Sequence, residues 1–227
     1  MIKIDLSGKT VLITGGARGL GSSISNKFLN AGANVIVTSR TSKTLNEYKK
    51  NNFSDKIEYR KLDVTNEISI SELLETVDKL DILVNSAAAV KGGIEYRIEN
   101  FADVVNVNLM GVMRLSHECL PKIAINKGSI INISSIFSIL GNANSPSYTA
   151  TKSGVQGLTK SMAASWATHG VRVNCIAPGW IKGNTSDKLI KDEQHKNVIL
   201  NRIPMGRLGN AEEIGMAAVF LASNGAS

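Results

Sequence analysis

Three side chains in the second half of the chain have types and spacing suited to proton transfer. Tyr148 and Lys152 are four residues apart and follow Ser145-Pro146, a cap and a first-turn proline, so we expect both on one face of a helix. A free tyrosine has a pKa of about 10, and a neighbouring ammonium lowers it by favouring the phenolate. Ser135 ends an apolar run, where its hydroxyl can hold a carbonyl oxygen. The hypothesis from these residues is acid–base chemistry at a carbonyl or alcohol group. The alternative is a chance pairing, because a tyrosine and a lysine four residues apart occur on many helices.

A glycine-rich turn near the start of the chain has the spacing of a phosphate-binding loop. After the apolar run 11–13 the sequence reads Thr14-Gly15-Gly16-Ala17-Arg18-Gly19-Leu20-Gly21. Glycines at this spacing let the backbone turn tightly and approach a pyrophosphate, and the last one lets the following helix pack closely on the sheet. The helix N-terminus then offers free N–H groups and the positive end of its dipole. A purely structural turn is the alternative, but the strand–loop–helix context favours dinucleotide binding.

The residues that follow the second and third apolar runs bear on which dinucleotide binds. A site for NAD needs a carboxylate that accepts hydrogen bonds from the ribose, whereas a 2′-phosphate is repelled by that carboxylate and attracted by arginine. Ser39 and Arg40 occupy this place without an acid, and Arg18 can add a second positive charge. Asp63-Val64 closes the third run, where the aspartate can meet the adenine amino group. We therefore expect NADP rather than NAD, with a merely solvated Arg40 as the alternative.

The elements that position these residues follow from the hydrophobic pattern. Strands are expected at 11–13, 33–38, 57–62, 81–84, 129–133 and 171–176, and helices at 20–31, 69–77, 101–121, 146–168 and 212–221. Strands that are apolar on both faces and alternate with amphipathic helices indicate a parallel sheet covered on both sides. No linker, repeat or low-complexity tract divides the chain. The sequence predicts an α/β fold, a single Rossmann-type doubly wound domain over residues 1–227 with helices on both faces.

The bulk properties exclude several classes of protein. With 227 residues, 43% of them hydrophobic and 20% charged, the chain has the composition of a globular domain. It shows no leader-like start and no apolar stretch near the roughly 18 residues that span a bilayer, so we expect a soluble, cytoplasmic protein. The net charge of +7 is scattered along the chain, which argues against a nucleic-acid partner. The cysteines and histidines lack metal-ligand spacing, so no metal is expected: Cys119, Cys175, His117, His169 and His195.

Taken together, the motifs resemble those of the classical short-chain dehydrogenase/reductase family. The resemblance runs from about Ser7 to Gly225, essentially the whole chain. Each motif is weak or moderate alone, but their order and spacing match the family. The set is Thr14-Gly15-x-x-x-Gly19-x-Gly21, Asn85-Ser86-Ala87-Ala88, Asn108, Ser135, Tyr148-x-x-x-Lys152, Asn174 and Pro178-Gly179.

The resemblance implies a role for each of these residues. Tyr148 would be the general acid in reduction and the base in oxidation, Lys152 would lower its pKa and bond the nicotinamide ribose, and Ser135 would polarise the substrate carbonyl. Asn108 would hold a water that links Lys152 to solvent. The implied cofactor contacts are the glycine loop, Ser39 and Arg40, Asp63 and Val64 at the adenine, Asn85, Ser86 and Ala87 beside the cofactor, and Pro178, Gly179 and Ile181 at the nicotinamide end.

Three departures from the family pattern carry expectations of their own. Ala88 adds a methyl group where the family usually has glycine close to the cofactor, which would shift or weaken binding. Lys182 and Gly183 follow Ile181 where a threonine often bonds the carboxamide, so this contact is not expected from position 183, and Thr185 is the candidate to replace it. Family members usually continue into a seventh parallel strand, whereas this chain stops first. We therefore expect a sheet without that strand, with an exposed edge and lowered stability.

The leading functional hypothesis is NADP-dependent hydride transfer to or from a small-molecule carbonyl or alcohol. In motif style and length the chain is closest to 3-oxoacyl-[acyl carrier protein] reductases, and a sugar or polyol dehydrogenase is the alternative. The segment 183–208, with Leu189, Ile190, Val198 and Ile199 as its main apolar positions, reads as a modest substrate lid.

A catalytically silent nucleotide sensor or scaffold on the same fold is the hypothesis from another class. Substitution of Tyr148 by Phe separates the two, because only an enzyme has turnover to lose. Family assembly would place the helices 101–121 and 146–168 between the subunits of a homodimer or homotetramer.

Overall fold

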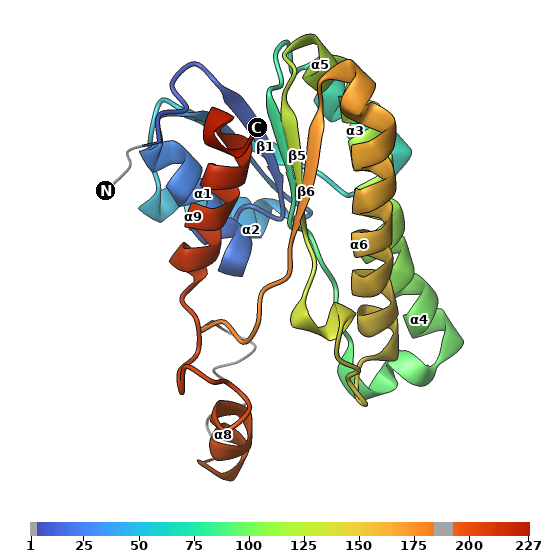
Figure 1. Cartoon of the computed structure of the whole chain (residues 1–227). Coiled ribbons are helices and arrows are strands. Elements are labelled where there is room, and N and C mark those ends of the chain that lie inside the picture. Colours follow the sequence, from blue (N-terminus) through green and yellow to red (C-terminus); the bar gives the residue numbers. More distant parts are fainter. Residues whose placement is uncertain (1–3, 184–192) are drawn as a thin grey trace.

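A computed structural model describes residues 4–183 and 193–227, which form a parallel sheet with helices on both faces (Figure 1). The strands are β1 (Thr10–Thr14), β2 (Asn34–Ser39), β3 (Ile57–Lys61), β4 (Ile82–Asn85), β5 (Ser129–Ile133) and β6 (Arg172–Ile176). They lie in the order β3-β2-β1-β4-β5-β6, and every neighbouring pair is parallel. This is the Rossmann-type doubly wound arrangement that the hydrophobic pattern predicts.

The helices divide between the two faces of this sheet. In Figure 1, α1 (Gly19–Asn30), α2 (Ser42–Asn51) and α9 (Ala211–Ala222) lie on one side, and α3 (Glu67–Glu75), α4 (Ile98–Val105), α5 (Gly111–Ile125) and α6 (Pro146–Trp166) lie on the other. The short helix α8 (Glu193–Leu200) lies away from both groups. Within the described residues β6 is an edge strand.

The two-residue periodicity of the strands separates the core into two layers. Val11 and Ile13 of β1 pack under α1 and α9, with Phe28 among their neighbours, whereas Leu12 points to the opposite layer, which includes Leu115 of α5. All five side chains are fully buried. Because burial of a large apolar side chain contributes about 1.5–3 kcal/mol, both faces stabilise the sheet and hold its strand ends in place.

The first and the last long helices of the fold lie side by side on one face. Helices α1 and α9 pack together in Figure 1, and Lys27 of α1 forms a salt bridge of 2.8 Å with Glu212 of α9. A Cβ atom at Gly215 would lie 2.7 Å from the Lys27 Cγ atom, so glycine permits this close approach. The guanidinium of Arg172 on β6 then donates hydrogen bonds to carbonyls at the end of α9, among them that of Leu221 at 2.6 Å.

Two helix predictions need correction. Helix α2 is missing from the predicted elements, because it is polar and buries only Leu45 and Tyr48. The sequence feature that marks its start is the N-cap residue Thr41, whose hydroxyl accepts a hydrogen bond from the Thr44 N–H. The helix expected at 101–121 begins earlier and continues past Pro121. It also contains a π-helical turn, Asn106–Met110, between α4 and α5. Among the described residues, no helix is both long and apolar enough to cross a bilayer.

Candidate active site

The predicted site residues gather at one edge of the sheet. Thr14, Ser39 and Asn85 are the last residues of β1, β2 and β4, and Ser135 and Pro178 follow β5 and β6 by two residues. The six strands of the described residues are all parallel, so their carboxyl ends share this edge. The connections change direction between β1 and β4, and ligands of open α/β sheets bind at such a switch point.

The glycine loop is held tightly at this switch point. The Thr14 hydroxyl oxygen accepts hydrogen bonds from the N–H groups of Ser86 and Ala87, each at 3.0 Å, which ties β1 to the loop after β4. Gly15 has a φ of +64°, and a Cβ atom there would lie 3.0 Å from the Ala87 Cα atom. A Cβ atom at Gly21 would collide with the Gly15 carbonyl. The loop therefore brings bare backbone and the start of α1 to the sheet edge.

The remaining loop residues take distinct positions. Arg18, the residue before α1, is exposed and makes no side-chain cap bond, and Gly19 opens the helix with a φ of +53°. Leu20 is partly buried and packs against the core. Ala88, in place of the family glycine, is exposed at the same edge.

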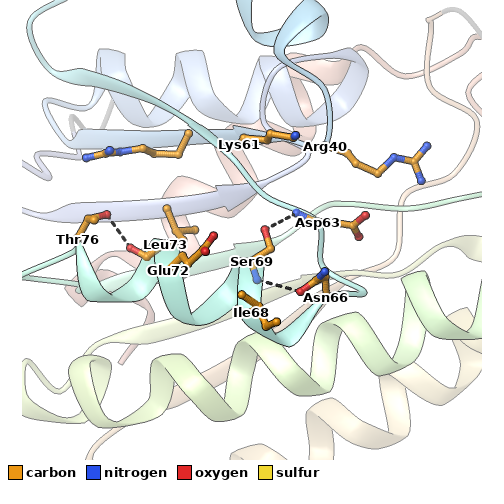
Figure 2. Close-up of a pocket in the computed structure, with 10 residues that line it drawn as sticks. Arg40, Lys61, Asp63, Asn66, Ile68, Ser69, Glu72, Leu73 and Thr76 are labelled. Atoms are coloured by element: carbon orange, nitrogen blue, oxygen red, sulfur yellow. Dashed lines mark hydrogen bonds between the residues drawn. The ribbon is translucent and has the colours of Figure 1, made fainter.

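A pocket of about 630 Å³ opens beside the ends of β2 and β3, and its lining includes Arg40, Lys61 and Asp63 (Figure 2). The Asp63 carboxylate accepts hydrogen bonds from the N–H and the hydroxyl of Thr65, at 2.9 and 2.7 Å. Burial acts to raise the pKa of Asp63, but these hydrogen bonds and the charges of Arg40 and Lys61 outweigh it and hold the pKa below its usual value. Val64, by contrast, points inward against Gly111.

Ser135, Tyr148 and Lys152 meet where β5 faces the first two turns of α6. Ser135 is buried; its Oγ accepts a hydrogen bond from the Phe137 N–H at 3.2 Å, which leaves its own O–H able to donate. Lys152 as a residue is 3% exposed. Its ammonium donates to the Ile133 carbonyl at 2.6 Å and lies 5.5 Å from the centroid of the Tyr148 ring. Burial lowers the pKa of Lys152 to about 8, opposed by the nearby Cys175.

The pKa of Tyr148 is raised in the structure, where the sequence suggested a lowered one. Burial of the phenol is the largest effect, and it outweighs the hydrogen bond with Ser135, which lowers the pKa. The negative charge of Glu95 adds to the increase. The protein groups alone therefore keep the phenol protonated at neutral pH.

Asn108 lies in the π-helical turn and joins two parts of the site. Its amide exchanges two hydrogen bonds with the backbone of Ala89, at 2.7 and 2.8 Å, and donates to the Thr151 hydroxyl at 3.3 Å. Thr151 in turn donates to the Tyr148 carbonyl at 2.9 Å. The Asn108 side chain is thus bonded to Ala89 and Thr151, and its role toward Lys152 stays a prediction.

Two further residues that were predicted to contact the cofactor, Asn85 and Pro178, support the strand ends. Asn85 donates to Ser116 and Asn132 at 3.0 and 2.8 Å, which links β4 to α5 and β5. The Pro178 carbonyl accepts a hydrogen bond from Ile136 at 2.9 Å, and so joins the loop after β6 to the Ser135 turn.

The residues after Gly179 pair with the segment that precedes α9. Gly179 is exposed, and Ile181 pairs with Gly209 in a short bridge. Thr185, Leu189 and Ile190 lie outside the described residues.

One buried acid at the site was not singled out from the sequence. Glu95, in the 3-10 turn Gly92–Tyr96, is 0% exposed and accepts hydrogen bonds from the Ser147 hydroxyl and the Tyr148 N–H. It is 52 positions from Ser147, and no local pattern marks it, because a lone glutamate between Ile94 and Tyr96 reads as a surface residue.

The fold, the glycine loop and the residues at the sheet edge define the class of Rossmann-type, nicotinamide-dependent oxidoreductases. A family model described as enoyl-(acyl carrier protein) reductase matches residues 15–227. The chain belongs to the classical short-chain dehydrogenase/reductase family, as its motifs predicted.

Individual relatives fall into two groups by name. The 3-oxoacyl-[acyl-carrier-protein] reductase FabG of Rickettsia bellii is 39% identical over 227 residues, which cover 99% of this chain and 93% of the relative. The 2-dehydro-3-deoxy-D-gluconate 5-dehydrogenase of Bacillus subtilis is also 39% identical, over 96% of this chain and 89% of the relative. The solved structure of a gluconate 5-dehydrogenase from Burkholderia cenocepacia, in complex with NADP and tartrate, has a TM-score of 0.88 at 29% identity, over 97% and 90% of the two chains.

Proposed function

We propose that the chain is an NADP(H)-dependent carbonyl reductase in which Tyr148, Ser135 and Lys152 carry the proton chemistry. The observation that supports this most is the meeting of the Ser135 hydroxyl with the Tyr148 phenol, with a buried ammonium beside them. This group lies at the same sheet edge as the glycine loop. The retained set of side chains argues against a silent nucleotide sensor.

The residues at the edge fit a phosphorylated dinucleotide. The loop leaves the backbone of Gly15 bare and the first turn of α1 without a side-chain cap, as a pyrophosphate requires. Arg40 and Arg18 are exposed cations on the side where a 2′-phosphate would lie, and the ionised Asp63 can accept from the adenine amino group. The related gluconate 5-dehydrogenase in complex with NADP supports the same choice of cofactor.

The proposed reaction follows from the contacts of these side chains. When bound, the cofactor supplies a hydride to the substrate carbon or accepts one from it. During reduction the Tyr148 phenol donates its proton to the substrate oxygen, and the Ser135 hydroxyl donates a hydrogen bond to the same oxygen. During oxidation the Tyr148 phenolate takes the proton back. With a pKa of about 8, Lys152 is mostly protonated at neutral pH and offsets the phenolate charge.

A 3-oxoacyl thioester is the substrate class that we favour, and the FabG relative supports it. The gluconate dehydrogenases support a sugar acid as the second candidate. Purified protein should first be titrated with NADPH and with NADH, following nicotinamide fluorescence, and then assayed with acetoacetyl-coenzyme A and NADPH and with D-gluconate and NADP. We expect tight binding of NADPH alone and turnover of the thioester. Turnover of gluconate only would reassign the substrate, and NADPH binding without turnover of any carbonyl tested would favour the sensor.

The assembly follows from the same family membership. We infer a homodimer or homotetramer, since apolar side chains near α4 and the start of α6 are exposed, including Tyr96, Ile98 and Ile139. Analytical ultracentrifugation at micromolar protein is the test, and a monomer throughout would overturn it.

A further inference from the structure

Glu95 is a fully buried carboxylate that lies against the start of α6. One oxygen, Oε2, accepts hydrogen bonds from the Ser147 hydroxyl at 2.6 Å and from the Tyr148 N–H at 3.0 Å. The other, Oε1, accepts from the N–H groups of Lys91 and Gly92 at 2.7 and 3.2 Å. Four donors therefore converge on one ionised group, as a buried charge requires.

Helix α6 needs such an acceptor because its own cap is incomplete. The N-cap residue, Ser145, makes no side-chain cap bond, and Pro146 at the first helical position has no N–H. The N–H of Tyr148 has no partner within the helix, and a buried N–H without an acceptor is costly. Glu95 satisfies it from a segment that is far away in sequence.

We propose that Glu95 is a positioning residue for the reaction: its carboxylate fastens the first turn of α6, and with it Tyr148, and holds a negative charge within electrostatic range of the phenol. The kinetic part rests on the proposed function, whereas the electrostatic part does not. Because Glu95 bonds the backbone of Tyr148 itself, any displacement of the carboxylate moves the phenol relative to Ser135.

Among the described acidic residues, Glu95 is the one whose charge acts on Tyr148. Lys152 approaches from α6 and the Ser135 hydroxyl from the loop after β5, while Cys175 on β6 faces Lys152. The Lys91 ammonium is bonded to Asp103 and Asn100, at 2.5 and 2.9 Å.

The Glu95 charge opposes formation of the phenolate, in agreement with the raised pKa of Tyr148. A protonated phenol is the form that donates a proton. Glu95 therefore helps to hold Tyr148 in that form.

The test compares E95Q with S147A. The Gln amide removes the negative charge and can accept from only one of the two donor pairs, whereas Ala at 147 removes a single hydrogen bond and leaves the charge. The readout is the Tyr148 pKa, measured as the near-ultraviolet absorbance of tyrosinate against pH, with the Y148F curve subtracted. It needs neither substrate nor cofactor.

We expect E95Q to lower the Tyr148 pKa and S147A to leave it unchanged or raise it. A mere loosening of the helix would hydrate the phenol and lower the pKa in both variants, so a shared downward shift overturns the proposal, as does an unchanged pKa in E95Q. If E95Q does not fold, the S147A variant tests the proposal by itself, because a lowered Tyr148 pKa in S147A would contradict the role of the Glu95 charge.

The kinetic readout separates this proposal from the proposed function. With acetoacetyl-coenzyme A, E95Q should lose roughly ten- to hundredfold in kcat with little change in the dissociation constant for NADPH. Lost NADPH affinity with unchanged kcat would contradict a positioning role. If the wild type shows no turnover but the tyrosinate titrations behave as expected, the proposed reaction fails while the electrostatic role of Glu95 stands.

Discussion

The glycine loop and the start of α6 lie at the same sheet edge but are held in different ways. The bend of the loop comes from residues close in sequence, since Gly15 adopts a positive φ and Gly21 leaves room for the Gly15 carbonyl. Its long-range contact is with the backbone of Ser86 and Ala87, through the Thr14 hydroxyl. The start of α6 depends on partners from distant segments, Glu95 and Asn108, which bond Ser147, Tyr148 and Thr151. A binding element that is encoded locally is therefore paired with a catalytic element that the rest of the fold must position.

Loss of the phenol should give the largest effect, because it removes the group that the α6 contacts position. Y148F should lower kcat by about 10²–10⁴-fold, since that is the usual contribution of a positioned acid or base. The NADPH dissociation constant, measured by nicotinamide fluorescence, should stay within a few-fold of the wild-type value. Retained turnover would show that Tyr148 is not the acid.

A methyl group added to the glycine loop should disrupt NADPH binding, the function of the locally encoded element. G21A places its Cβ against the Gly15 carbonyl, so we expect NADPH affinity to fall by roughly a hundredfold and stability by about 1–3 kcal/mol. G157A is the matched control, because Gly157 lies in α6 with nothing within 4 Å of its added Cβ. That variant should bind NADPH normally, because Gly157 does not touch the glycine loop. Equal behaviour of the two would refute a steric requirement at Gly21.

A charge reversal at Arg40, directly after β2, should test which residue selects NADPH over NADH. R40E should weaken NADPH binding by roughly ten- to a hundredfold and leave NADH binding nearly unchanged, because only NADPH carries the 2′-phosphate. R60A is the control: Arg60 lines the same pocket but forms a salt bridge with Glu58. An equal loss for both nucleotides in R40E would indicate general destabilisation of the pocket.

Low pH should weaken the hydrogen bonds between the Glu95 carboxylate and the start of α6. Burial alone would raise the pKa of Glu95, but its four hydrogen bonds outweigh that effect and lower the pKa in the folded state. A lowered folded-state pKa stabilises the protein above the usual glutamate pKa of about 4.3, and the contribution is lost as the pH falls through the folded value. E95Q should therefore cost about 1–2 kcal/mol at neutral pH by urea unfolding. A gap from wild type that does not shrink in acid would contradict this.

The sheet, its order of strands and the glycine loop could be predicted because short-range patterns encode them. Val11, Leu12 and Ile13 are apolar on both faces, and the glycines stand directly after them. Helix α2 escaped prediction since only two of its side chains are buried. Glu95 escaped because its partners are brought to it by the fold, and nothing in its neighbourhood distinguishes a buried acid from a solvated one.

The pairing of α1 with α9 has a consequence for biosynthesis. Helix α1, which follows the glycine loop directly, finds its neighbour only when α9 has been made, and Lys27 and Glu212 are 185 positions apart. At a synthesis rate of about 5–20 residues per second, the interval between them is on the order of ten to forty seconds. During that time the apolar face of α1 that α9 will cover is open to chaperones, and the nascent chain is expected to acquire a complete cofactor site only late in its production.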